Sequence, residues 1–189
     1  TGDGVNDAPS IKNADIGVGM GITGTDVTKN VADMVLADDN FATIVSAVEE
    51  GRKIYDNIRK AIQFLLSSNL SEVVSVFVST LLGFTILKPI HILWINLVTD
   101  SFPALALGME HGDLDVMERE PRAANEGIFA NGLGIDVLYQ GILIAGLTIL
   151  SYFVGHYLEF GIFGFGDSAQ GMTMAFMTMS LAEIFHSFN

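Results

Sequence analysis

The chain has 189 residues, half of them hydrophobic, and carries 22 acidic against 9 basic residues, a net charge of −13. This composition, with a mean hydropathy of +0.46, indicates a membrane protein, and the uneven hydrophobicity predicts one soluble and one membrane part. The acidic balance argues against nucleic-acid binding, which needs a basic face. Cysteine is absent, which excludes a disulfide framework and a thiolate metal site.

Residues 1–40 are predicted to form a soluble α/β segment. The stretches 14–20 and 34–37 have the pattern of short buried strands, and a short helix capped by Thr25 or Asp26 is expected between them. Strands that alternate with short helices are typical of a doubly wound parallel sheet. Because the chain begins inside a motif and without Met, we expect it to be a fragment of a longer protein, with only the last part of that sheet.

The first nine residues, TGDGVNDAP, form a Gly-rich turn with carboxylates where a strand would end. We expect Asp3 to be a Mg²⁺ ligand beside a phosphate, and Asn6 and Asp7 to orient the phosphate and the metal, or the turn itself. The alternative is that Asp3 and Asp7 are ordinary turn and cap residues. The full string is more specific than GDG alone.

A second glycine pattern, G-x-G-x-x-G, starts at Gly19. No complete βαβ unit with an acidic partner surrounds it, so we interpret these glycines as tight backbone packing at the end of a strand rather than a dinucleotide site.

A helix capped by Asn40 is expected to begin near Phe41 and to continue, as a stalk over 41–60, into the first membrane segment. The membrane domain is expected over 57–189, and its apolar segments are each long enough to cross a bilayer. These spans are 57–82, 89–108, 132–155 and 169–188.

The basic residues near the spans predict the orientation of the chain. Six of them flank one side, at positions 52, 53, 59, 60, 119 and 122, against Lys88 alone on the other. By the positive-inside rule, residues 1–56, the loop 109–131 and the C-terminus are expected to be cytoplasmic.

The predicted spans contain the carboxylates Glu72, Asp100 and Glu183, with no Lys or Arg at the same depth. A carboxylate at the bilayer centre costs about 2.5 to 3.5 kcal/mol, so the three together would cost about 7 to 11 kcal/mol. This cost demands a compensating partner.

Further polar residues share helical faces with these acids. Asn69 lies three residues before Glu72, and Asn96 and Thr99 precede Asp100 at helical spacing, so two polar faces can meet. Pro103 frees the carbonyl of Thr99 and loosens the helix beside Asp100. A bound cation or a proton would supply the positive charge that these faces lack. The alternative is that the polar residues only form hydrogen bonds between helices.

Several motifs in order resemble the C-terminal half of P-type cation-transporting ATPases, of the calcium-pump (type IIA) branch. They are TGDGVNDAP, VLADDNF, EEGRKIYDNIRK, SSNLSEVV, LWINLVTDSFPALALG and DLDVMEREPR. The resemblance implies a partial HAD-like phosphorylation domain followed by an α-helical membrane bundle, the fifth to eighth membrane helices. It also implies that the loop 109–131 is the connector that packs near the phosphorylation domain, although a solvated charge run is as good a reading of its individual residues.

The resemblance also implies a set of Ca²⁺ ligands. One ion would be bound by Asn69, Glu72, Thr99, Asp100 and Glu183, and a second by Asn96 and Asp100 together with a helix that this chain lacks. Sodium–potassium pumps tend to carry Asp where Asn96 stands, and soft-metal pumps use membrane cysteines, so calcium is favoured.

For the longer protein, the resemblance implies ATP hydrolysis with Mg²⁺ through an aspartyl-phosphate, and Ca²⁺ transport across a lipid bilayer with H⁺ in return. The phosphorylated aspartate, the nucleotide-binding domain and the first four membrane helices are absent, so we expect this fragment alone to be inactive. The alternatives are a pump for Na⁺ or Mn²⁺ with the same ligands, and a non-catalytic membrane module.

Overall fold

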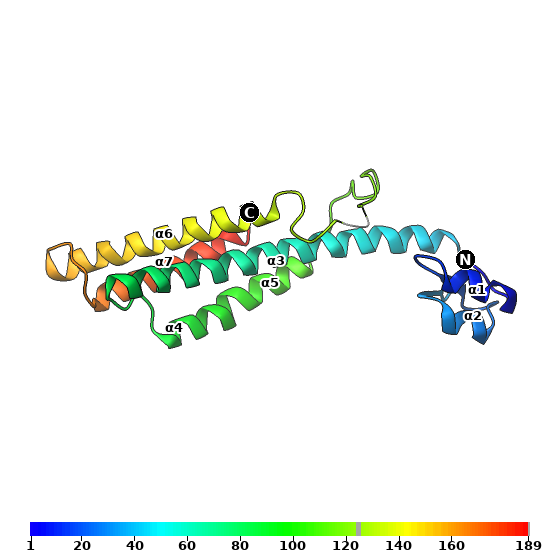
Figure 1. Ribbon diagram of the computed structural model, residues 1–189, viewed down its shortest axis with the longest axis horizontal. Helices are drawn as coiled ribbons and strands as arrows, with labels where there is room; N and C mark the ends of the chain where they lie inside the picture. The colour runs from blue at the N-terminus through cyan, green and yellow to red at the C-terminus, as the bar shows by residue number, and fades with distance from the viewer. Residues whose placement is uncertain (124–125, 189) are drawn as a thin grey trace. The chain divides into compact units, whose positions relative to one another are not determined.

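The computed structural model describes residues 1–123 and 126–188. In chain order its elements are η1 (Val5–Asp7), α1 (Ala8–Lys12), β1 (Val18–Met20), α2 (Asp26–Val31), β2 (Met34–Leu36), α3 (Ala42–Leu82), α4 (Pro89–Trp94), η2 (Ile95–Asp100), α5 (Ser101–Gly108), α6 (Leu133–Phe160) and α7 (Ala169–His186) (Figure 1). They form two compact units. The first contains Thr1–Lys53 with Leu114–Glu118, and the second contains Ile54–Asp113 and the chain from Arg119 onwards.

The first unit contains a small parallel sheet. β1 pairs with β2 in parallel, with Val18 opposite Met34, and Gly2 forms a further parallel bridge with Gly19. The predicted alternation of parallel strands with a helix is therefore confirmed. Among the described residues, two three-residue strands are the whole of the sheet, so a complete doubly wound domain is not formed by this part of the chain.

Two helix starts in this unit follow the predicted capping. Thr25 rather than Asp26 caps α2, because its hydroxyl accepts a hydrogen bond from the amide of Thr28. The side chain of Asn40 accepts a hydrogen bond from the amide of Ala42, where α3 begins. The continuous helix expected from this point is confirmed, since α3 runs 41 residues to Leu82.

The second unit is a helical bundle in which α6 and α7 pack closely. Glycines make this approach possible, because a Cβ added to Gly155 would lie 2.7 Å from the backbone of Gly171. Phe84 stacks on Tyr152 of α6 with 4.4 Å between ring centroids. The buried core of the unit consists of Phe84, Ile86, Leu87, Ile95, Ile144, Tyr152, Ala175 and Met179.

Three of the four predicted membrane spans are supported by the length and composition of their helices. Three helical stretches are long and apolar enough to cross a membrane: Ala42–Leu82, Pro89–Gly108 and Leu133–Phe160. The fourth predicted span, 169–188, forms the 18-residue helix α7, but it does not belong to that set. Its polar residues, including Gln170, Glu183 and His186, reduce its apolar character.

Three residues from the part of the loop 109–131 that belongs to the second unit contact α3 within that unit: Glu110, Arg119 and Ala130. The amide of Asn57 donates to the carbonyl of Glu110 over 2.7 Å, and Arg59 donates to the carbonyl of Ala130 over 2.8 Å. Arg119 forms an ion pair with Asp56. Two backbone carbonyls and the Arg119 side chain of this loop therefore make specific contacts with the helix.

Candidate cation-binding site

The helix that follows α4 changes its winding just where the polar residues occur. Ile95–Asp100 (η2) is a π-helix, and α5 continues from Ser101. The hydroxyl of Ser101 bonds to the carbonyl of Asn96, five residues earlier. Pro103 supplies no N–H to the preceding turns, which agrees with the loosening predicted beside Asp100. Such π segments occur frequently at functional sites.

Three carboxylates from three different elements are buried in the second unit. Glu72 of α3 is 6 % exposed, Asp100 of η2 is 2 % exposed and Glu183 of α7 is 0 % exposed. None of them forms an ion pair with a basic side chain in the part of the chain that the structure describes. The predicted burial of unpaired acids is therefore confirmed for these residues.

The polar faces of α3 and η2 meet, as their spacing predicts. The side-chain amide of Asn96 lies 2.9 Å from both carboxylate oxygens of Glu72 and also donates to the carbonyl of Ile92. The hydroxyl of Ser68 donates to Oδ1 of Asp100 over 2.7 Å. Two of the three acids thus each receive a hydrogen bond from a neighbouring helix.

Of these three acids, Glu183 has the fewest hydrogen bonds among the described residues. Its electrostatic neighbours are Asp100 and Glu72, and the hydroxyls of Ser68 and Ser71 lie beside it. Those hydroxyl protons are directed elsewhere, however, to Asp100 and to the carbonyl of Ser68. Both carboxylate oxygens of Glu183 are buried and have no hydrogen-bond partner in the described part of the chain.

Further polar atoms on the same elements are buried and unpaired among the described residues. Oδ2 of Asp100 and the hydroxyls of Ser75 and Ser180 are also buried without a hydrogen-bond partner. Leaving a buried polar group unpaired costs about 1 to 3 kcal/mol, and more when the group is charged. A bound cation or added protons would give partners to the unpaired carboxylate oxygens of Asp100 and Glu183.

Carboxylates alone do not form a metal site here. Within residues 1–123 and 126–188, no three His, Cys, Asp or Glu side chains are grouped closely enough to hold a metal ion. Ca²⁺ takes six to eight oxygen ligands of mixed type in a flexible shell. Amide, hydroxyl and backbone oxygens, such as those of Asn96 and Thr99, would have to contribute beside the acids.

The structure does not bring every predicted ligand together. Thr99 is buried beside Asp100 and donates to the carbonyl of Ile95, but Asn69 is exposed and its side-chain amide donates to the carbonyl of Leu65. An i, i+3 spacing separates two residues by about 60° around a helix, so Asn69 can lie outside the buried face that holds Glu72.

Sequence reasoning missed the role of Ser68. The sequence alone did not single out this residue as a partner of the buried acids. Its position four residues before Glu72 places it on the same helical face, and this spacing is the signal that could have linked it to the buried acids.

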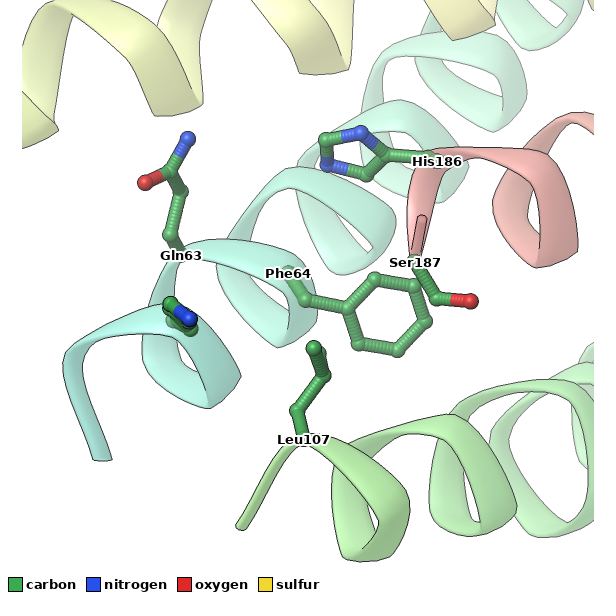
Figure 2. Close-up of a pocket in the computed structure, with 6 residues that line it drawn as sticks. Gln63, Phe64, Leu107, His186 and Ser187 are labelled. Atoms are coloured by element: carbon green, nitrogen blue, oxygen red, sulfur yellow. The ribbon is translucent and has the colours of Figure 1, made fainter. Parts of the chain in front are cut away.

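A separate small pocket lies between α3, α5 and α7 and is partly open (Figure 2). None of the predicted ion ligands lines it. Its lining residues are Lys60, Gln63, Phe64, Leu107, His186 and Ser187.

In the first unit, the TGDGVNDAP turn is shaped by Asp7. Oδ2 of Asp7 accepts hydrogen bonds from the amides of Asp3 and Gly4, at 3.1 and 3.0 Å. Of the roles considered for Asp7, this contact supports the one of holding the turn. The side chains of Asp3 and Asn6 are exposed, and one free carboxylate fits Mg²⁺, which commonly takes one or two protein carboxylates together with phosphate oxygens.

Comparison with known proteins identifies the family. Residues 84–189 match the family described as cation transporting ATPase, C-terminus. The whole chain is 52% identical to a calcium-transporting ATPase of Bacillus subtilis and 48% identical to calcium-transporting ATPase 1 of Bacillus cereus, and it covers 21% and 22% of those proteins. Over 92% of its length it is 46% identical to calcium-transporting ATPase 2, endoplasmic reticulum-type, of Arabidopsis thaliana, of which it covers 17%. The chain thus spans about a fifth of the length of these relatives, and it belongs to the cation-transporting ATPase family.

Proposed function

We propose that this chain is part of an ATP-driven P-type pump that moves Ca²⁺ across a membrane through an aspartyl-phosphate intermediate. The buried acids Glu72, Asp100 and Glu183 supply part of the cargo site. The single observation that carries this proposal is the burial of these acids, from three elements, without a basic partner among the described residues. The names of the relatives support Ca²⁺ as the cargo.

Within this proposal, Asn96 and Thr99 contribute oxygen ligands beside the three acids. Asn69 faces outward, so it would reach the cargo only together with an element of the longer protein. The hydrogen bonds from Asn96 to Glu72 and from Ser68 to Asp100 support this role, because they orient the two carboxylates before an ion arrives.

The first unit would contribute to the phosphoryl-transfer chemistry. Residues 1–40 would be the end of a HAD-like phosphorylation domain, 41–60 its stalk and 57–189 the transmembrane domain. Asp3 would hold Mg²⁺, while Asn6 and Asp7 orient the turn. When bound, Mg²⁺ would neutralise charge on the transferred phosphoryl group. ATP would be bound mainly by other parts of the longer protein, and this chain alone would be inactive.

The orientation follows from the basic residues. Arg59, Lys60 and Arg119 lie at one end of the bundle, and each contacts the loop 109–131 or lies within it. This end, together with residues 1–56 and the C-terminus, would be cytoplasmic.

The full-length protein provides the test. We expect its Mg²⁺-dependent ATPase activity to be stimulated by Ca²⁺, and we expect Glu72→Gln and Asp100→Asn to abolish the stimulation. Glu110→Gln is a matched control, because Glu110 is an exposed acid of the loop. Stimulation by Na⁺ or Mn²⁺ instead would reassign the cargo, and absence of any metal-dependent ATPase activity would favour a non-catalytic module.

Proton countertransport is the second part of the proposal. The three buried acids, which have no basic partner among the described residues, would need protons when Ca²⁺ leaves, because isolated charges are costly in this environment. In sealed vesicles, Ca²⁺ uptake into the lumen should be accompanied by a rise in the luminal pH, because protons leave the lumen in exchange. Uptake without a coupled pH change would contradict it.

A further inference from the structure

The loop after β1 is held by a carboxylate from the segment after β2. Oδ1 of Asp39 accepts hydrogen bonds from the amides of Gly21 and Ile22, at 2.6 and 2.9 Å. Oδ2 accepts from both the amide and the hydroxyl of Thr23, at 2.6 and 2.7 Å. Three consecutive amides therefore surround one carboxylate, an arrangement that binds anions in other proteins.

Asp39 adopts a backbone conformation that few residues tolerate. Its φ is +51°, in the left-handed region, where Asp and Asn are the favoured residues after Gly. The hydrogen bonds, of which the one from the Ile22 amide has the largest effect, lower the pKa of the Asp39 carboxyl to about 2. The carboxylate is therefore charged at every pH at which the protein would work.

The residues that follow this loop in the chain contact the Asp3 turn. The amide of Thr25 and the hydroxyl of Thr28 both donate to the carbonyl of Asp3, at 2.9 and 3.4 Å. A Cβ on Gly24 would lie 2.0 Å from the carbonyl oxygen of Met20, so the loop is closely folded on itself. The glycines of the G-x-G-x-x-G pattern are thus used for tight packing, as predicted, and not for a nucleotide.

The geometry points to Asp39 as a positioning residue for the Asp3 carboxylate. The Asp39 carboxylate accepts hydrogen bonds from the amides of residues 21–23 and so fixes this loop. Thr25 and Thr28, which follow the loop, donate to the backbone carbonyl of Asp3. The loop 21–25 and the segment with Asp39 follow the carboxyl ends of β1 and β2, and the Asp3 turn follows the parallel bridge at Gly2. This is the edge at which α/β sheets bind their ligands. The inference rests on the proposed function, in which Asp3 binds Mg²⁺.

The test uses Asp39→Asn in the full-length protein. Asn keeps the size of the side chain and tolerates the left-handed conformation, but it loses the charge and one acceptor oxygen. Because removal of a residue that orients a metal ligand typically costs 10- to 100-fold in metal affinity, we expect the Mg²⁺ concentration for half-maximal ATPase activity to rise about 10-fold or more.

Asp38→Asn is the matched control. The Asp38 carboxylate accepts from the amide of Asn40 and the hydroxyl of Thr43, so it supports the start of α3 and not the loop. The Asp38→Asn substitution should leave the Mg²⁺ requirement unchanged. Thr23→Val, which removes only one of the four hydrogen bonds, should shift the requirement in the same direction by less, and it serves if Asp39→Asn does not fold.

A second readout is independent of activity. Hydrogen–deuterium exchange of the full-length protein should become faster in Asp39→Asn both at residues 21–23 and at the amides of Asp3 and Gly4. Faster exchange at 21–23 alone would mean that Asp39 is only a local cap, and would overturn the inference. An unchanged Mg²⁺ requirement would also overturn it, whereas a wild-type protein without Mg²⁺-dependent activity would count against the proposed function itself.

Discussion

The substitution Ser68→Ala tests how the buried acids are prepared for an ion. The hydroxyl of Ser68 donates to Oδ1 of Asp100 over 2.7 Å, while Oδ2 of Asp100 has no hydrogen-bond partner. Ser68 is therefore the sole hydrogen-bond donor to this carboxylate among the described residues. Its removal leaves a buried carboxylate with no group to orient it.

The expected magnitude follows from that contact. A hydrogen bond to a charged group contributes about 1.5 to 3 kcal/mol. Because each 1.36 kcal/mol corresponds to a factor of ten, the Ca²⁺ concentration for half-maximal ATPase activity should rise about 10- to 150-fold. The assay is a Ca²⁺ titration of the purified full-length protein at one fixed pH, with Ser68→Thr expected to retain most of the affinity because it keeps the hydroxyl.

Ser75→Ala is the matched control for this prediction. Ser75 is also buried on α3, but its hydroxyl has no hydrogen-bond partner, so its loss should change the titration little. If Ser68→Ala titrated like the wild type, or if both variants lost affinity equally, the hydrogen bond to Asp100 would have no special role.

Three further predictions concern stability and pH. Asn57→Ala removes the buried bond to the carbonyl of Glu110 and should lower the unfolding free energy by about 1 to 3 kcal/mol, measured by thermal unfolding in detergent. Gly155→Ala should cost about 1 to 3 kcal/mol in the same assay, since its Cβ would lie 2.7 Å from α7, whereas Gly146→Ala has open space and should be neutral. The pKa of the Asp39 carboxyl is lowered to about 2. Its hydrogen bonds should therefore protect the amides of residues 21–23 from exchange fully above the unfolded pKa of about 3.9, and this protection should be lost as the pH falls through about 2.

Local signals in the sequence predicted much of the fold. Cap residues placed the starts of α2 and α3 to within a residue or two, because Thr25 and Asn40 make side-chain contacts with the next turn. Apolar runs placed the long helices. Helical periodicity also predicted that the faces of Glu72 and Asp100 would be buried.

Other features depend on contacts that periodicity does not encode. The exposure of Asn69 depends on which neighbours surround α3, and a 60° offset from Glu72 was enough to take it out of the buried cluster. The role of Ser68 depends on where η2 presents Asp100, and the π-helical winding there is a tertiary feature that Pro103 suggests but does not specify. The carboxylate of Asp39 folds back on a loop 16 to 18 residues earlier, a distance that no local motif covers.

The most direct test of the central claim is equilibrium binding of radioactive Ca²⁺ to the full-length protein without ATP. Glu183 is the sharpest probe, because both of its carboxylate oxygens are buried and unpaired. The account predicts saturable binding with a dissociation constant on the order of micromolar, lost in Glu183→Gln and retained in Glu110→Gln. Undiminished binding in Glu183→Gln would contradict the claim that the buried acids form the cargo site.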